Sequence, residues 1–348
     1  MRRVVVISTG GTIASRWQGE GYAAQAGGSE VLASAPVPEG LDVRVVDLFT
    51  VNSSRITTAH QLELLRTVRE VLTDPEVAGV VVTHGTDTLE ESAYLLSLFH
   101  DDPRPVVFTG AQQPLEVADG DAPGNLYDAL LTASCGRDTG VVIVFAGLVH
   151  EARGTVKVHT LAPQAFADPC GSPLGRVEFG RVTWLRRPDR TPALELRLPG
   201  PGGRLPRVDI VMHHTGADTL LLDAVLAAGA EGVVLVGTGA GNATPDIAAA
   251  VACAVDSGVL VALSTRVQTG PVAALYTGGG AVDLAAAGAL LSGSLRAGQT
   301  RIAVLASLLS AGPAATAAER TDVLRRVLDG AAVEPPLSVP AGSRRSAA

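Results

Sequence analysis

The sequence predicts an α/β fold of two domains, a larger N-terminal domain with a parallel sheet and a smaller C-terminal α/β domain. Short β-branched runs alternate with Ala/Leu-rich helical patterns along most of the chain, which is typical of βαβ units. The length of 348 residues suits two domains better than one. Hydrophobic residues make up 47% of the chain, so both domains can bury a core.

In the N-terminal half, buried-looking strands and amphipathic helices follow one another. We expect strands at residues 3–8, 43–47, 79–83, 105–109 and 141–145. We expect helices at residues 60–72, 89–99 and 124–134. The first helix has Thr58 as its expected N-cap and an apolar face made by Leu62, Leu65, Val68 and Leu72.

A second α/β pattern follows a break. Residues 186–206 contain five prolines, so we expect a linker at 191–206, although residues 193–198 alternate like a strand. Beyond it, we expect strands at residues 208–212, 232–236, 259–263 and 301–304, and helices near 217–228, 245–257 and 314–329. This predicts an N-terminal domain at 1–190 and a smaller, flavodoxin-like domain at 207–332. The Pro/Ser/Arg/Ala-rich tail, 333–348, is expected to be disordered.

Composition and charge argue against several classes of function. The formal net charge of −8 disfavours nucleic acid or an anionic membrane as the main partner. The chain has three cysteines, which are Cys135, Cys170 and Cys253. Their odd number, their wide spacing and the lack of a CxxC pair disfavour a disulfide framework or a zinc site. The N-terminal apolar run is too short for a signal peptide, and the apolar stretch 220–236 carries two acids. We therefore expect a cytoplasmic protein without a membrane span.

Two short motifs carry most of the functional information. The sequence STGGT at residues 8–12 follows the apolar run 4–7, and THGTDT at residues 83–88 follows the run 79–82. Ligands of an open parallel sheet bind where its strands end. Both motifs should therefore face one crevice, as a hydroxyl nucleophile and its helpers require.

The first motif makes Thr12 a candidate nucleophile. Two glycines before Thr12 suit a sharp turn and a close ligand approach, which would leave the hydroxyl facing the crevice. The alternative is a glycine-rich turn in which Thr12 only caps a helix. A dinucleotide site is a weak interpretation, because no third glycine completes a GxGxxG spacing.

The second motif also allows two interpretations. Thr86 and Asp87 precede the helix from Leu89 and could simply form its N-terminal cap. The same helix N-terminus would supply N–H groups for a substrate carboxylate or an oxyanion, and capping does not exclude that role. We expect His84 to be structural rather than basic. The seven histidines form no metal-binding motif, so no metal is expected.

Lys157, in the segment RGTVK at residues 153–157, is the only lysine in a chain with 26 arginines. It could be a surface lysine that arose by drift. The functional interpretation is that the position needs an ammonium, because an arginine does not change its protonation state at working pH. A lysine beside Thr86 and Asp87 could help to move a proton to or from a nucleophilic hydroxyl.

The order of these motifs resembles that of the bacterial L-asparaginase/glutaminase family over nearly the whole chain. The sequence has TGGT, then an SS pair, HGTDT, a DGxxxxN segment and RGTVK. The resemblance implies an amidohydrolase that converts asparagine to aspartate and ammonia through a threonine acyl-enzyme, without metal or organic cofactor. Its N-terminal domain would be catalytic.

The resemblance also implies roles for individual residues. The catalytic residues would be Thr12 as nucleophile, Tyr22 in a mobile loop at residues 16–30, and the set Thr86, Asp87 and Lys157. The substrate α-carboxylate would be held by Ser53 and Ser54, and its α-ammonium by Asp87. The segment around Asp119 and Asn125 would be structural.

Part of the site would come from a second subunit. Asn242, in the glycine-rich turn at residues 237–242, resembles an asparagine that reaches the neighbour's site, which implies a homodimer or homotetramer. Several family members carry a glutamate shortly after the next turn, at residues 264–270. This chain has LYTG at residues 275–278 and no acid there. The preference between asparagine and glutamine is therefore open.

Other functions compete with an asparaginase. The alternatives are a glutaminase-asparaginase, a subunit of a tRNA-dependent amidotransferase, and a non-catalytic sensor of an amino acid. The amidotransferase subunit carries an additional N-terminal domain, whereas the first motif here begins at residue 8, and the negative charge also disfavours it. A sensor would need Ser53 and Asp87 but could lack Thr12 and Lys157, which are both present.

Overall fold

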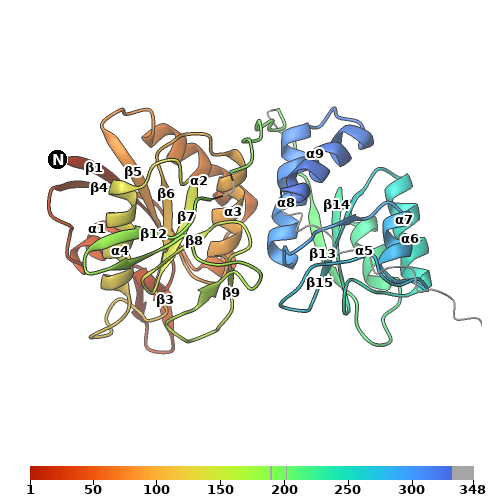
Figure 1. Ribbon diagram of the computed structural model, residues 1–348, viewed down its shortest axis with the longest axis horizontal. Coiled ribbons are helices and arrows are strands. Elements are labelled where there is room, and N and C mark those ends of the chain that lie inside the picture. The colour runs from red at the N-terminus through yellow and green to blue at the C-terminus, as the bar shows by residue number, and fades with distance from the viewer. Residues whose placement is uncertain (189, 201, 331–348) are drawn as a thin grey trace, which may run out of the picture.

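The computed structural model describes residues 1–188, 190–200 and 202–330. The chain forms two lobes joined by the green segment near residue 190 in Figure 1. The expected disordered tail at 333–348 lies outside the described residues. Within the described part, no helix is both long and apolar enough to cross a membrane.

In the described part of the chain, the N-terminal sheet has eight strands in the order β12-β11-β8-β7-β6-β5-β1-β4. They are β1 (Arg2–Gly10), β4 (Leu41–Val51), β5 (Val77–Thr83), β6 (Val106–Thr109), β7 (Val141–Phe145), β8 (Leu148–Glu151), β11 (Gly175–Glu178) and β12 (Arg181–Trp184). All pairings from β4 to β7 are parallel. The predicted parallel sheet is confirmed, and all five expected strands are present.

The other edge of this sheet is antiparallel, which the sequence pattern did not predict. β7 and β8 form a hairpin whose two turn residues, Ala146 and Gly147, have φ of 49° and 77°. Positive φ at both turn residues matches the twist of paired strands. This conformation is unfavourable for alanine, and the Ala146 N–H is held by the side chain of Asn125 at 2.9 Å.

Helices cover both faces of the sheet because successive residues of a strand point to opposite sides. Val5 and Ile7 of β1 pack with α2 and α3, and Val4 and Val6 pack with α1 and α4. The helices are α1 (Gly28–Ala33), α2 (Thr58–Val71), α3 (Leu89–Phe99) and α4 (Ala122–Cys135). The N-cap of α2 is Thr57, one residue before the expected Thr58, and it forms a capping box with His60.

Short elements decorate the ends of these strands. The 3-10 turns η1 (Thr12–Ala14) and η2 (Ser53–Arg55) follow β1 and β4. The expected mobile loop at residues 16–30 contains a hairpin of β2 (Ser15–Trp17) and β3 (Tyr22–Ala24) and then the first half of α1. A second short pair joins β9 (Val156–Lys157) to β10 (Phe166–Ala167).

The smaller C-terminal sheet, in the described residues, has four parallel strands in chain order. They are β13 (Val208–Met212), β14 (Gly232–Gly237), β15 (Leu260–Thr265) and β16 (Leu290–Leu291). One face carries α8 (Ala297–Ala311) and α9 (Ala317–Asp329); the other carries α5 (Leu220–Ala227), α6 (Pro245–Asp256) and α7 (Ala281–Ala286).

The expected strand at residues 301–304 is wrong, because these residues lie inside α8. Residues 302–306 of α8 are all fully buried. A short helical stretch that is buried on every side cannot be distinguished from a buried strand by its apolar run alone. The fourth strand is instead the two-residue β16, which is too short to produce a pattern.

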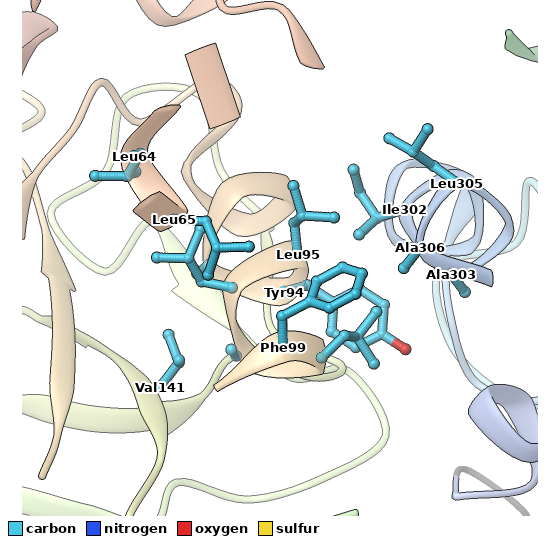
Figure 2. Packing of buried hydrophobic residues seen from close by; sticks show 14 of the residues in the cluster. Leu64, Leu65, Tyr94, Leu95, Phe99, Val141, Ile302, Ala303, Leu305 and Ala306 are labelled. Atoms are coloured by element: carbon cyan, nitrogen blue, oxygen red, sulfur yellow. The ribbon is translucent and has the colours of Figure 1, made fainter. Parts of the chain in front are cut away.

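The two lobes share one hydrophobic core where α3 packs against α8. Tyr94 and Leu95 of α3 face Ile302 and Ala306 of α8 (Figure 2). The strand-like alternation at residues 193–198 has the same origin. Leu194, Leu196 and Leu198 pack against this core, but the segment does not form a strand.

Candidate active site

The strand-end turns after β1 and β5 pack backbone against backbone. Gly11 has φ of 84°, and a Cβ placed there would lie 2.2 Å from the Cα of Gly85. A Cβ on Gly85 would lie 2.6 Å from Ser53 Oγ. Only glycine fits both positions, because a side chain on either would drive the turns apart. The two motifs therefore meet at one edge of the sheet, together with Ser53.

Ser53 is buried in η2 and is attached to the N-terminus of α3. Its hydroxyl accepts the backbone N–H of Asp87 at 3.2 Å, and its carbonyl accepts the hydroxyl of Thr88 at 2.9 Å. These bonds fix the turn after β4 to the turn after β5. The neighbouring Ser54 is exposed to solvent.

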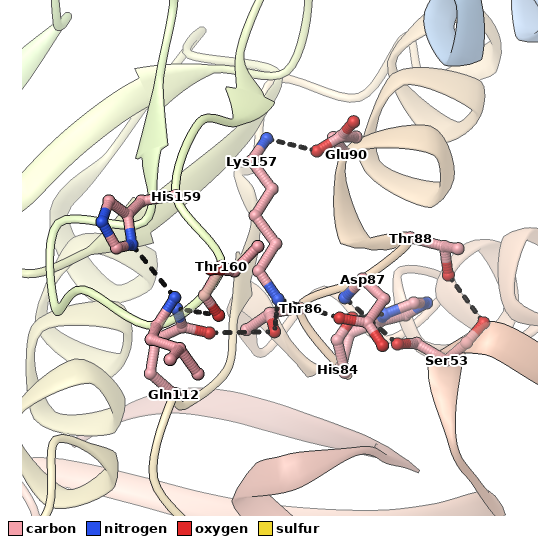
Figure 3. Close-up of polar contacts among 12 residues, drawn as sticks. Ser53, His84, Thr86, Asp87, Thr88, Glu90, Gln112, Lys157, His159 and Thr160 are labelled. Atoms are coloured by element: carbon pink, nitrogen blue, oxygen red, sulfur yellow. Dashed lines mark hydrogen bonds and ion pairs between the residues drawn. The ribbon is translucent and has the colours of Figure 1, made fainter.

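Lys157, far away in sequence, reaches the same place from β9. Its Nζ lies 2.8 Å from Thr86 Oγ1 and 2.8 Å from Asp87 Oδ1 (Figure 3). Thr86 is buried, the Lys157 side chain is 18% exposed and the Asp87 side chain is 63% exposed. The ammonium is thus covered by protein while the carboxylate faces solvent. This is not the position of a drifted surface lysine.

Glu90, the second residue of α3, contacts the backbone of the same lysine. Its Oε2 accepts the Lys157 N–H at 2.5 Å. Burial raises the pKa of Glu90 to about 7, and Glu91 adds to this, whereas the Lys157 N–H and ammonium oppose it. The sequence alone places this acid only in the first turn of the helix. No local pattern could show that it turns toward Lys157.

Gln112 is a further polar residue that the sequence analysis missed. The Thr86 hydroxyl donates to its Oε1 at 3.2 Å, while its Nε2 donates to the carbonyls of Thr160 and Ala162. Its own N–H is held by Asp121 at 2.8 Å. Gln112 follows the carboxyl end of β6, so the strand-end rule applied to one more strand would have found it.

The segment around Asn125 holds the turn that carries Gln112. The Asn125 amide donates to Gly110 O at 3.0 Å and to Asp121 Oδ2 at 3.2 Å. It also accepts the Ala146 N–H of the β7–β8 turn. This is the structural role that was expected for the DGxxxxN segment.

Thr12 and Tyr22 lie in neighbouring elements. Thr12 is half-buried at the start of η1, directly after Gly11. Tyr22 lies on β3, is 49% exposed, and packs the edge of its ring against Trp17 with centroids 5.1 Å apart. Within the described residues, the Tyr22 hydroxyl has no hydrogen bond, so it does not bond to Thr12 in this structure.

His84 is buried and neutral, as expected for a structural histidine. Its Nδ1 lies 2.8 Å from Gly85 O. Burial lowers its pKa to about 4. Its Nε2, however, is buried without a partner among the described residues, so the imidazole is only half satisfied.

Comparisons with known proteins found two matching family profiles and several similar proteins. The family profile described as "Asparaginase, N-terminal" matches residues 3–190, and "Glutaminase/Asparaginase C-terminal domain" matches residues 207–320. The chain belongs to the asparaginase family. An L-asparaginase of Bacillus licheniformis is 36% identical over 296 residues, which cover 83% of this chain and 90% of the relative.

Two further asparaginase-family proteins resemble nearly the whole chain. A probable L-asparaginase of Deinococcus radiodurans is 34% identical over 335 residues, or 94% of this chain and 98% of the relative. The crystal structure of a probable cytoplasmic L-asparaginase from Campylobacter jejuni superposes with a TM-score of 0.79 at 25% identity. It covers 93% of this chain and 99% of that chain. The structural match confirms the two-domain α/β architecture.

Asn242, the asparaginase-family residue expected from a second subunit, lies in the C-terminal lobe. Its Oδ1 accepts the Ala281 N–H at 3.4 Å, and its backbone pairs with Thr238. These contacts stay within its own lobe and do not reach Thr12 or Lys157. Leu275 and Tyr276, in the segment that lacks the expected acid, are exposed.

Proposed function

We propose that this chain hydrolyses the side-chain amide of L-asparagine to aspartate and ammonia. One contact supports the proposal above all: the single lysine of the chain lies 2.8 Å from both the Thr86 hydroxyl and the Asp87 carboxylate. An ammonium beside a hydroxyl and a carboxylate can donate and recover a proton during acyl transfer. Membership of the asparaginase family indicates a side-chain amide as the class of substrate.

The proposed mechanism has two displacement steps. The Thr12 oxygen attacks the amide carbon, and N–H groups of the strand-end turns, with Thr86, stabilise the oxyanion. The threonine proton passes through the Thr86, Asp87 and Lys157 set to the leaving nitrogen, and ammonia departs. Water then attacks the ester, so that aspartate leaves and the Thr12 hydroxyl is restored. Tyr22 would assist the nucleophile once the hairpin closes on substrate.

Substrate binding is assigned to residues around the same edge. Ser53 and Ser54 would hold the α-carboxylate and Asp87 the α-ammonium, with Asn242 contributed by a second copy of the chain in a homodimer or homotetramer. The Asp87 carboxylate suits a cation, because Lys157 bonds only its Oδ1 and the side chain is 63% exposed. We also propose a cytoplasmic location.

The test is release of ammonia from free amino acids by the purified protein. We expect turnover of L-asparagine without added metal, cofactor or tRNA. Because no acid is present at residues 275–278, L-glutamine belongs in the same panel as the second candidate substrate. Tight binding of asparagine without turnover would instead identify a sensor. Activity only with aminoacylated tRNA would identify an amidotransferase subunit.

A further inference from the structure

The segment that carries Lys157 is held by a glutamine from the other lobe. Gln299 of α8 accepts the Gly154 N–H on Oε1 at 2.7 Å, and its Nε2 donates to the carbonyls of Ala152 and Thr155 at 2.8 and 2.9 Å. Gln299 is 1% exposed. One buried amide thus bonds three backbone groups of four successive residues, and both of its N–H donors are used.

The backbone in this segment needs such support. Gly154 has φ of 83°, and a Cβ there would lie 2.6 Å from Asp168 Oδ2. Buried backbone groups without partners are costly, so the loss of Gln299 would leave three of them to find new ones. Lys157 follows Thr155 by two residues, so a rotation of this backbone moves the position that its ammonium reaches.

Besides the β9–β10 pairing, the side chains of Glu90 and Arg153 hold the same segment, and packing on its remaining side is sparse. Glu90 accepts the Lys157 N–H from the N-terminal lobe. Arg153 donates to the carbonyls of Val327 and Leu328 at the end of α9. Beside Lys157 lies a cavity of about 290 Å³ between the lobes. Hydrogen bonds, rather than tight packing, therefore fix the segment on that side.

We propose that Gln299 is a positioning residue: through the backbone of residues 152–155, it holds the Lys157 ammonium against Thr86 and Asp87. The C-terminal lobe thereby sets the geometry of the catalytic group in its own chain. Gln299 touches no reacting atom, and its effect on rate rests on the proposed amidohydrolase function. The substrate-binding serines lie on η2, which Gln299 does not contact, so kcat should change more than KM.

The kinetic test compares two variants at Gln299 with a matched control. Gln299→Met keeps the length of the side chain and removes all three bonds, and Gln299→Glu keeps the shape but removes both donors. Ile302→Ala is the control, because Ile302 is buried on the same helix and faces α3 (Figure 2) without bonding residues 152–157. We expect both Gln299 variants to lose about tenfold or more in kcat, with KM within about threefold, and the control to keep kcat although its melting temperature falls.

A spectroscopic test reads the position of Lys157 directly. Because the chain has one lysine, ¹⁵N-lysine labelling yields one backbone amide signal, that of the N–H bonded to Glu90. We expect this signal to shift or broaden in both Gln299 variants and to stay in place in Ile302→Ala. The measurement needs no turnover, and the Gln299→Glu protein serves if Gln299→Met does not fold.

The two arms separate failure of the inference from failure of the proposed function. A wild-type protein without amidase activity would reject the proposed function, while a shifted lysine signal would still support the positioning role. A wild-type protein with activity, together with a folded Gln299 variant of normal kcat and an unmoved lysine signal, would overturn the inference. An equal shift of the signal in Ile302→Ala would also overturn it, because the effect would then belong to the lobe interface as a whole.

Discussion

Lys157 shows what a single residue contributes in a chain that otherwise uses arginine for every positive side chain. Its ammonium has two partners at 2.8 Å and little exposure. A guanidinium is larger, planar and keeps its proton at any working pH. We therefore expect the position to require a compact ammonium rather than positive charge alone.

This requirement leads to a prediction for two substitutions. We expect Lys157→Arg to lose nearly as much kcat as Lys157→Met, each by about 10²-fold or more, because neither can exchange a proton with Thr86. Steady-state ammonia release with asparagine measures both. Near-normal turnover of the arginine variant would show that only positive charge matters there.

Glu90 makes a prediction about stability and pH. Its pKa is raised by burial from 4.5 to about 7, so the folded protein holds this proton more strongly than the unfolded chain does. Its contribution to stability is therefore complete below about pH 4.5 and is lost as the pH rises through 7. The side chain at this position cannot ionise in the Glu90→Gln variant, so the free energy of unfolding of this variant should rise relative to that of the wild type as the pH increases through this window. The gain is at most about 3 kcal/mol, and less to the extent that water reaches the carboxyl.

Urea unfolding at pH 5 and pH 8 measures this difference. The stability of Glu90→Gln relative to wild type should be greater at pH 8 than at pH 5. Glu39→Gln, at an exposed position, is the control and should show no such trend. An equal difference at both pH values would mean that Glu90 is ionised throughout.

At the scale of elements, the β2–β3 hairpin is attached to the body of the lobe by few bonds. The Ala24 N–H donates to Asn52 Oδ1 at 3.2 Å, and the Trp17 N–H donates to Glu116 Oε1 at 2.8 Å. Both bonds are exposed, and Trp17 and Tyr22 are about half-exposed. Such an element can open at low cost and close over a ligand.

We predict that aspartate slows tryptic cleavage after Arg16 in this hairpin. Closure on the ligand would remove the backbone around Arg16 from the protease. Cleavage after Arg137, an exposed residue between α4 and β7, is the internal control and should not change. If aspartate leaves both rates unaltered, the hairpin is not a lid.

The fold could be predicted where the local hydrophobic pattern matches the element that the segment forms in the folded protein. The parallel strands β1, β5, β6 and β7 are apolar runs, and the structure confirms them. The hairpin edge β8 was missed because its sequence, LVHE, is not an apolar run. Helix α8 was partly mistaken for a strand because its residues 302–306 form an unbroken apolar run. Periodicity therefore fails to distinguish a helix from a strand where the segment is buried on every side.

The candidate site could be predicted only in part, for a different reason. Thr12, Thr86 and Asp87 follow strand ends, so topology alone indicates that they lie together. Lys157 was suggested by its rarity. Glu90 and Gln299 contact residues far away in the chain, and no spacing in the sequence shows which way their side chains turn.

At the scale of the whole molecule, Asn242 lies in the C-terminal lobe and its contacts remain there. Its proposed role therefore requires a second chain. Two-fold pairing would make two shared sites at once, each with Thr12 from one chain and Asn242 from the other.

Complementation tests this arrangement. Thr12→Val and Asn242→Ala should each be inactive alone. Subunits mixed after dissociation should recover up to about a quarter of wild-type activity, because half of the dimers are mixed and each has one intact site. A double variant carrying both changes, mixed with wild type in the same way, controls for exchange. A fully active monomer in light scattering at assay concentration would contradict the shared site.

The most direct measurement is the kcat of Thr12→Val for asparagine, with the folded state verified by its circular dichroism and melting temperature. The substitution removes the hydroxyl at nearly constant volume, so stability should change little. If Thr12 is the nucleophile, covalent chemistry stops and ammonia release falls by orders of magnitude. A folded Thr12→Val protein that keeps more than about a tenth of the wild-type kcat would contradict the account.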